Sequence, residues 1–262
     1  MNDLVEAAIR ARLAELGSRL SAPISVARET GSTSDDAKAA ASDGAAHGAA
    51  FLADAQTKGR GRGGHSWHSP PGENLYLSMV ARPRVPAAVV APITLAVGVA
   101  VARALEAHVP EALRVKWPND VLSAGGKKLG GVLVEGQLRG SEVTSLVVGV
   151  GVNVHATSFP DVIAARATSL RLLGGEGLDR SRIAAELLAS IASAIATFEE
   201  SRLTSFLDDL ARRDALLGRS VTVSGLSGLA AGIDGEGRLL VRQADGTTAA
   251  IVSGEVERWD FA

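Results

Sequence analysis

The chain contains no cysteine among its 262 residues, which excludes disulfide bonds, thiolate metal sites and cysteine nucleophiles. Aromatic residues make up only 3%, and the 27 lysines and arginines are slightly outnumbered by 29 aspartates and glutamates. Proteins that bind nucleic acid usually combine a basic excess with stacking aromatic residues, so this composition argues against a DNA partner. The absence of cysteine fits a cytoplasmic protein, and we expect that location.

Long uninterrupted apolar runs are also lacking. The most apolar segment, Ala87–Ala102, carries no charge, but Pro92, Thr94 and Gly98 interrupt it. It is shorter than the roughly 20 residues that span a bilayer. The first segment, Met1–Leu16, places apolar residues on one helical stripe between charged ones, which is typical of an amphipathic helix and not of a secretory signal. We therefore expect no membrane partner.

Hydrophobic residues make up 46% of the chain, enough for a substantial core. Short apolar runs alternate with helical patterns up to about residue 200, which predicts an α+β domain with a mixed sheet packed against helices. Strands are expected at 49–53, 75–81, 113–117, 130–136 and 145–150, a hairpin turn at 123–126, and helices at 34–47, 87–107, 183–198 and 203–210.

The pattern changes near Gly218. Five short strands separated by turns are expected from there on, at 221–224, 232–234, 239–242, 249–252 and 256–259. Strands this short and this close together predict a small SH3-like β-barrel. We therefore expect two domains, 1–217 and 218–262.

A glycine- and arginine-rich segment lies inside the long predicted loop at 57–71. Its core is Gly59-Arg60-Gly61-Arg62-Gly63-Gly64. Glycine permits close backbone approach, and arginine offers a fork of donors that suits phosphate or carboxylate oxygens. The spacing matches neither a Walker A loop nor a dinucleotide fingerprint. By itself the composition fits an anion clamp and a solvated or RNA-contacting loop equally well.

Two further clusters follow strand-like runs. In Lys116-Trp117-Pro118-Asn119-Asp120 the proline ends a strand, so its polar residues emerge at a sheet end, where α/β proteins often build sites. In Lys128-Leu129-Gly130-Gly131 a lysine opens a strand beside small residues, which leaves its ammonium group unobstructed. Taken alone, the first cluster is better explained as an Asx turn and the second as a surface lysine pair.

Taken together and in order, these motifs closely resemble the biotin–protein ligases. The resemblance covers roughly Thr30 to Asn153, and it rests on the following segments: Gly31–Ser34, Asp54–Arg62 with Trp67, Asn74–Ser78, Lys116–Asp120, Lys128–Glu135 and Gly149–Asn153. The chain departs from the family's pattern at Ser34, where asparagine is common, and at Gly63-Gly64-His65, where basic residues often follow. Only about 20 residues precede the expected catalytic fold, too few for a helix-turn-helix module, so we expect no repressor function.

The resemblance implies a class II synthetase-like catalytic domain that binds biotin, ATP and Mg²⁺, forms biotinyl-5′-AMP, and transfers biotin to a lysine of a biotin carboxyl carrier domain. It implies that the protein is a monomer or a homodimer. Carried over residue by residue, it implies catalytic roles for Arg60, Arg62 and Lys128, and biotin contacts from Ser32, Thr33, Ser34, Gln56, Arg60, Gly61, Arg62, Lys128 and Gly130. It implies ATP contacts from Trp67, Lys116, Asn119, Asp120 and Asn153, with Mg²⁺ near Asp120 and no firm protein ligand set.

Two alternatives remain open at this point. A lipoate or octanoate ligase or transferase would share the catalytic fold, although the arginine loop and the β-rich end favour biotin. A non-enzymatic module that binds RNA or phosphate through the arginine loop would need stacking aromatics and a basic surface. His65 and His68 stand three residues apart in the loop, but they lack a third ligand at metal spacing.

Overall fold

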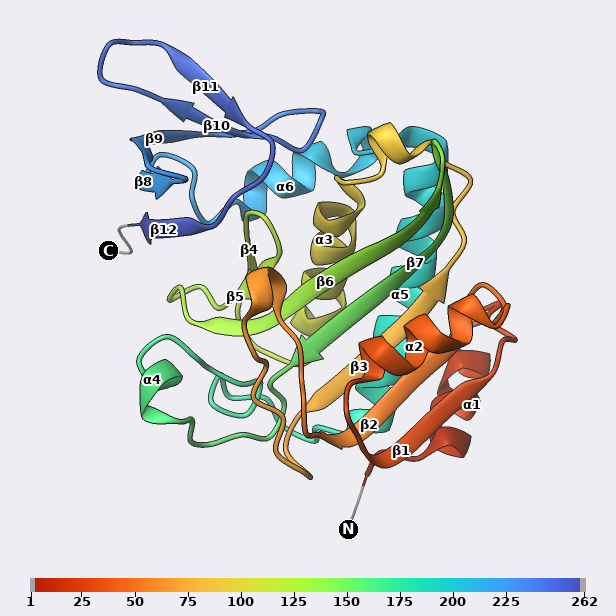
Figure 1. Cartoon of the computed structure of the whole chain (residues 1–262). Coiled ribbons are helices and arrows are strands. Elements are labelled where there is room, and N and C mark those ends of the chain that lie inside the picture. Colours follow the sequence, from red (N-terminus) through yellow and green to blue (C-terminus); the bar gives the residue numbers. More distant parts are fainter. Residues whose placement is uncertain (1–2, 260–262) are drawn as a thin grey trace.

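The structure is a computed structural model that describes residues 3–259 (Figure 1). Its centre is a seven-stranded sheet with the order β1-β2-β3-β7-β6-β5-β4, in which β1 and β2 are parallel and the other neighbours antiparallel. The strands are β1 (Ile24–Thr30), β2 (Ala50–Gln56), β3 (Leu75–Ala81), β4 (Arg114–Lys116), β5 (Asp120–Leu122), β6 (Lys128–Arg139) and β7 (Glu142–Val152). This is the mixed sheet that the sequence predicts.

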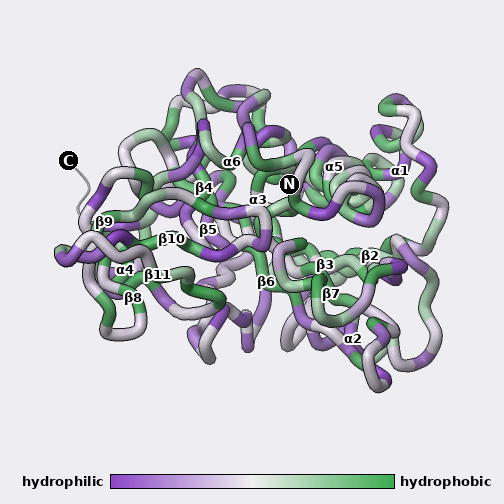
Figure 2. Tube along the Cα trace, turned by 90° about the horizontal axis from the view of Figure 1, so that it is seen from above, coloured by the Kyte–Doolittle hydropathy of each residue, from purple (hydrophilic) through white to green (hydrophobic). Residues whose placement is uncertain are grey.

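Helices cover the two faces of this sheet unequally. Figure 2 shows α1 (Glu6–Glu15), α3 (Ile93–Glu106) and α5 (Arg180–Ser201) on one face and α2 (Thr33–Ser42) on the other. Among the described residues, α5 is the one helix long and apolar enough to cross a membrane, but 56% of its apolar stretch is buried in the protein. It packs against α1, α3 and β3, so its apolar residues form core. Two shorter helices are α4 (Asp161–Ala164) and α6 (Leu207–Arg213).

Side-chain alternation along the central strands separates the core from the face that carries α2. In β3, Leu75, Leu77 and Met79 join the main core beneath the three helices, whereas Tyr76 and Ser78 point to the opposite face. Along β7, the valines at 148, 150 and 152 enter the same core, while the glycines at 149 and 151 face the α2 side. The α2 face of the sheet centre therefore carries small and polar residues.

A second, five-stranded antiparallel sheet with the order β11-β10-β9-β8-β12 forms the C-terminal part, as the fold prediction requires. Its strands are β8 (Ser220–Val223), β9 (Leu226–Ile233), β10 (Leu239–Arg242), β11 (Thr248–Ile251) and β12 (Val256–Trp259). Trp117, which is fully buried, fixes this sheet to the first domain by donating its indole N–H to the Gly237 carbonyl at 3.0 Å. Gly237 itself packs against Pro92 and Leu95 at the start of α3.

Several predicted element boundaries were wrong. The helix expected at 34–47 ends at Ser42, because Gly44 adopts a φ of 88° that stops a helix. The helix expected at 87–107 begins at Ile93, and only a short 3-10 turn, Ala87–Val89, precedes Pro92. Strand β9 begins six residues before the expected 232–234 and ends at Ile233. Of the predicted N-terminal helix, residues 1–2 lie outside the described part, and α1 begins at Glu6.

Candidate active site

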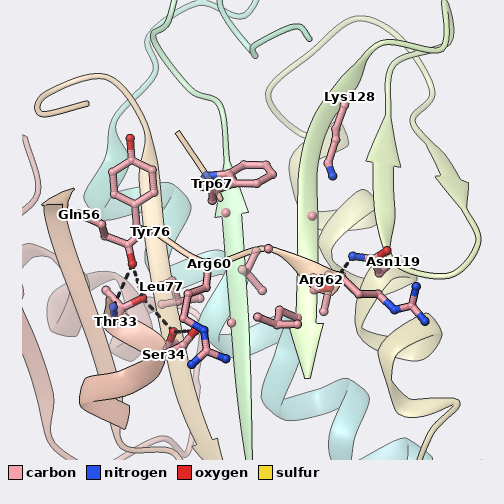
Figure 3. Close-up of a pocket in the computed structure, with 18 residues that line it drawn as sticks. Thr33, Ser34, Gln56, Arg60, Arg62, Trp67, Tyr76, Leu77, Asn119 and Lys128 are labelled. Carbon is pink, nitrogen blue, oxygen red and sulfur yellow. Dashed lines mark hydrogen bonds between the residues drawn. The ribbon is translucent and has the colours of Figure 1, made fainter. Parts of the chain in front are cut away.

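A pocket lies on the α2 face of the sheet, directly above the small residues of β3, β6 and β7. Strand register places Gly149 between Ser78 and Leu133, and Gly151 between Tyr76 and Gly131. Eighteen residues line the pocket, which holds about 470 Å³ including its open mouth (Figure 3). Glycine at two central positions keeps the floor flat, because a Cβ at Gly149 would stand 2.8 Å from Ser34 Oγ and one at Gly151 would stand 2.5 Å from the Trp67 indole.

One end of the pocket is built from hydroxyl and amide groups. Gln56 Oε1 accepts from the Thr33 backbone N–H at 2.9 Å and from the Thr33 hydroxyl at 3.2 Å. The buried Ser78 hydroxyl joins those of Thr33 and Ser34 at 2.9 and 3.1 Å. Ser32 is 2% exposed, and its hydroxyl has no hydrogen-bond partner within residues 3–259. A buried ligand with both donors and acceptors fits such an end.

The glycine- and arginine-rich segment forms the predicted loop, with one 3-10 turn at Arg62–Gly64, and its two arginines diverge (Figure 3). Arg60 pairs with Asp35 and Glu135, one from α2 and one from β6. Partial burial of Arg60 lowers its pKa, but the hydrogen bonds and charges of Glu135 and Asp35 outweigh this, so the pKa is raised overall. Arg62 donates to the backbone carbonyl of Gly254, in the turn before β12, at 2.5 Å.

The opposite end of the pocket is cationic. Lys128 Nζ lies 2.6 Å from an Asp120 carboxylate oxygen and 5.3 Å from the centre of the Trp67 ring. Lys116 Nζ lies 3.6 Å from the other Asp120 oxygen and 5.5 Å from the Trp259 ring centre. The carboxylate of Asp120 thus holds two ammonium groups that each also contact an indole. This arrangement fixes Lys128 at the edge of the cavity without burying its charge.

Trp67 closes the pocket from the loop side by resting on the glycine floor. A Cβ added to Gly151 would stand 2.5 Å from the indole, and one added to Gly131 would stand 3.5 Å from it. Within the described chain, the Trp67 indole nitrogen is buried and has no hydrogen-bond partner. The loop is therefore seated through the shape of its tryptophan and not through a hydrogen bond of that ring.

The structure brings most of the predicted site residues together. The pocket is lined by the following nine of them: Thr33, Ser34, Gln56, Arg60, Gly61, Arg62, Trp67, Asn119 and Lys128. Asp120 and Lys116 lie just outside it, next to Lys128, and Ser32 lies buried beside Thr33.

Two predicted residues stand behind the wall of the pocket. Gly130 lets two strands approach, because its Cβ would lie 2.8 Å from the Gly151 carbonyl. Asn153 donates to the Thr168 carbonyl at 2.8 Å and so fixes the segment that follows α4. In the positions that the structure gives them, both support the pocket wall.

The prediction missed most of the pocket floor. Tyr76, Ser78, Gly149, Gly151 and Leu133 line the cavity but were not assigned to it. Their common signal is strand periodicity, since glycines two apart in a valine-rich strand leave a flat stripe on one face. Burial raises the pKa of Tyr76, whose hydroxyl donates to the Pro70 carbonyl at 2.9 Å, so it acts here as a neutral donor.

Metal ligands of the usual kind are not grouped in this part of the molecule. Nowhere in the described range 3–259 do three histidine, aspartate or glutamate side chains lie together as a metal site would require. His65 instead approaches Glu255 at 3.4 Å, across the contact between the loop and the C-terminal sheet.

Comparison with known proteins places this fold and pocket in a defined class. Residues 29–153 match the Biotin/lipoate A/B protein ligase family, and residues 216–259 match the Biotin protein ligase C terminal domain. The bifunctional ligase/repressor BirA of Bacillus spizizenii is 35% identical over 234 residues, which cover 86% of this chain and 71% of that protein. The biotin–[acetyl-CoA-carboxylase] ligase of Mycobacterium tuberculosis is 34% identical over 243 residues, covering 89% and 88%.

A solved structure extends the likeness to three dimensions. The biotin protein ligase of Aquifex aeolicus in complex with biotin and ATP superposes with a TM-score of 0.77 at 29% identity, covering 92% of this chain and 99% of that one. The chain belongs to the biotin protein ligase family, and it is a ligase enzyme. The lipoate alternative is not favoured, because these relatives are biotin ligases.

Proposed function

We propose that the protein joins biotin to a lysine of a biotin carboxyl carrier domain at the expense of ATP. The observation that carries this proposal is the pairing of a hydroxyl and amide end with a cationic end in one pocket. Biotin has the complementary polarity, with a neutral cyclic urea at one end and a carboxylate at the other. The flat glycine floor between the two ends suits its apolar middle.

Specific roles follow from where the side chains lie. Thr33, Ser34 and Gln56 hydrogen-bond the urea ring, with Ser32 next to them and Gly61 on the loop that covers it. Lys128 and Arg62 face the region where the biotin carboxylate meets the α-phosphate. Trp67, Asn119, Asp120 and Lys116 lie on that same side and serve the nucleotide, while Gly130 and Asn153 support the wall.

The reaction proceeds in two steps that these charges assist. A biotin carboxylate oxygen attacks the α-phosphorus, the bond to the β-phosphate bridging oxygen breaks, and pyrophosphate leaves with biotinyl-5′-AMP formed. The acceptor lysine amine then attacks the carbonyl carbon, the mixed anhydride bond breaks, AMP leaves, and the amine loses a proton. Negative charges approach one another in the first step, so fixed cations such as Lys128 and Arg62 lower its barrier. Closure of the loop excludes water that would hydrolyse the anhydride.

The residues present fit Mg²⁺ only as a partner of the nucleotide. Asp120 is the carboxylate nearest the cationic end, and Lys128 and Lys116 already hold it. Mg²⁺ commonly takes one or two carboxylates and completes its shell with water and substrate phosphates. When bound with ATP, it would neutralise phosphate charge beside Asp120.

The remaining proposals concern the domain boundary, the location, the oligomeric state and the partners of the protein. We propose a ligase domain at 1–217 and a C-terminal domain at 218–262, the last residues of which lie beyond the described range. We propose a cytoplasmic protein, a monomer or homodimer, whose macromolecular partner is the acceptor domain and not DNA or a membrane.

Mass spectrometry of a purified acceptor domain tests the function. Incubation with the protein, biotin, ATP and Mg²⁺ should add one biotin to the acceptor lysine, and omission of ATP should abolish the addition. Lys128→Ala should slow it on the order of 100-fold, the cost of removing one donor that stabilises developing charge. Lys127→Ala is the matched control, since that neighbour does not line the pocket. Addition of lipoate or octanoate in place of biotin would contradict the proposal.

A further inference from the structure

A continuous chain of hydrogen bonds joins the carboxyl end of the glycine- and arginine-rich loop at 57–71, here called the basic loop, to the floor of the pocket. We call it the hydroxyl relay, and its members are, in order, the Trp67 carbonyl, Ser69, Gln56, Thr33, Ser78 and Ser34. Figure 3 shows the part of this chain that runs from Gln56 through Thr33 to Ser34. Because the Trp67 carbonyl can only accept and the Thr33 backbone N–H can only donate, the direction of every hydrogen in the relay can be derived.

The direction is set first at the loop. The Trp67 carbonyl can only accept, so the Ser69 hydroxyl donates to it at 2.9 Å. Ser69 Oγ in turn accepts from Gln56 Nε2 at 2.9 Å. The orientation of this amide is fixed, because its oxygen accepts the Thr33 backbone N–H at 2.9 Å, and a backbone N–H can only donate.

The same logic runs on to the pocket floor. Gln56 Oε1 carries no hydrogen, so the Thr33 hydroxyl must donate to it at 3.2 Å. The bond between Thr33 and Ser78 at 2.9 Å must then use the Ser78 hydrogen. Consequently the bond between Ser78 and Ser34 at 3.1 Å must use the hydrogen of Ser34. All three hydroxyl hydrogens are thus used inside the protein, so Thr33, Ser78 and Ser34 can offer a ligand only oxygen lone pairs. Within residues 3–259 the neighbouring Ser32 hydroxyl has no partner and is the donor left for a ligand's acceptor.

We infer that Ser69 and Ser78 are positioning residues that make the polar end of the pocket select an acid whose head group carries N–H donors. The inference rests on the proposed function, in which that head is the cyclic urea of biotin. The head groups of lipoate and octanoate have no N–H, so they would leave the Ser34 oxygen, which accepts no hydrogen bond within the relay, without a donor. Sites built around a buried hydrogen bond reject analogues that lack it far more strongly than apolar pockets discriminate size.

Close packing at Gly59 ties the relay to the loop. A Cβ at Gly59 would stand 2.4 Å from the Trp67 carbonyl oxygen and 2.6 Å from Ser69 Oγ. The Trp67 N–H also donates to the Gly59 carbonyl at 2.9 Å. The chain therefore needs glycine where it passes the relay. Closure of the loop and orientation of the floor hydroxyls thereby become parts of one hydrogen-bonded unit.

Calorimetric titration of the full-length protein with biotin tests the relay in two ways, by variants of the protein and by analogues of the ligand. Ser78→Ala and Ser69→Ala should each weaken biotin binding about 10-fold, the usual effect of one buried hydrogen bond, and leave the KM for ATP unchanged. Ser145→Ala is the matched control, because Ser145 is an equally buried serine whose hydroxyl donates to Gln137 outside the pocket.

The ligand arm uses biotin methylated at either ring nitrogen. The unmodified protein should bind at least one of these analogues about 100-fold more weakly than biotin. Ser78→Ala should reduce this difference in affinity between biotin and its analogues. Without the Ser78 oxygen, the Ser34 hydroxyl hydrogen is free to donate to the ligand, so the pocket floor no longer offers acceptors alone. Equal binding of biotin and both analogues, or Ser69 and Ser78 variants that match Ser145→Ala, would overturn the relay. An unmodified protein that binds no biotin would overturn the proposed function itself.

Discussion

Gly151→Ala should unseat the basic loop while leaving the sheet intact. The added Cβ would lie 2.5 to 2.8 Å from three atoms of the Trp67 indole, closer than any real contact. Gly151 has no positive φ, so alanine adopts its backbone conformation without strain. The conflict is therefore with a loop side chain alone, and the loop must yield.

The size of the effect follows from the cost of overpacking. One methyl group forced into a filled site costs about 1 to 3 kcal/mol. Here that cost lowers the free energy of loop docking and leaves the free energy of global folding nearly unchanged. The equilibrium constant for loop docking should fall by roughly 5- to 150-fold. Biotin affinity should fall by a similar factor, since Trp67 and the arginines beside it cover the pocket.

Limited trypsin digestion reads out the loop directly, because Arg60 and Arg62 lie in it. Gly151→Ala should be cut there much faster than the unmodified protein, with little change in Tm. Gly131→Ala is the matched control from the paired position on β6, where the new Cβ would meet Trp67 and Lys128 at ordinary contact distances of 3.4 to 3.6 Å. If trypsin cuts Gly151→Ala no faster than Gly131→Ala, and the two variants bind biotin with equal affinity, the seating of Trp67 on Gly151 is refuted.

Three other expectations concern stability. Burial raises the pKa of Asp3, but hydrogen bonds from Arg180 outweigh it and lower the pKa to about 2, so this carboxylate stabilises the fold above about pH 4 and loses its contribution as pH falls through about 2. Asp3→Asn should cost about 2 kcal/mol in urea unfolding at pH 7, and the difference should shrink steadily below pH 4. Arg180→Met should lower the free energy of unfolding by about 3 to 5 kcal/mol, because Asp54 loses a buried partner. The Arg180 side chain is 1% exposed and lies 2.7 Å from the Asp54 carboxylate. A loss below about 1 kcal/mol would show that the pair is dispensable. Trp117→Phe should lower unfolding free energy by about 1 to 3 kcal/mol through the orphaned Gly237 carbonyl, and it should speed proteolysis between the two sheets.

Local periodicity was sufficient to predict the central strands. Leu75–Ala81 is apolar except for Ser78 and is buried at every position, as expected of a strand covered on both faces. Strand β1 gave no such signal, because most of its residues at the sheet edge are exposed or half-exposed and their pattern does not alternate cleanly. Its existence depends on pairing with β2, a contact that no local pattern encodes.

In the candidate site, too, some features could be predicted from the sequence and others depend on the fold. The arginine loop and the cluster around Lys128 were found because their residue types suit anions. Their partners were not, since Arg62 meets Gly254 and Arg60 meets Glu135 across long stretches of chain. Sequence composition indicates that arginines could bind an anion, whereas the fold determines which acidic groups and carbonyls hold them.

The contact between Arg62 and the Gly254 carbonyl also has a consequence for biosynthesis. A ribosome has added the whole pocket wall by Gly151, but the acceptor of Arg62 comes 103 residues later. At 5 to 20 residues per second, the basic loop of the nascent enzyme lacks this one contact for roughly 5 to 20 s. Nascent chains stalled before residue 254 should therefore expose Arg62 to trypsin even when the first sheet has formed. Protection of Arg62 in such chains would show that the loop closes without the C-terminal sheet.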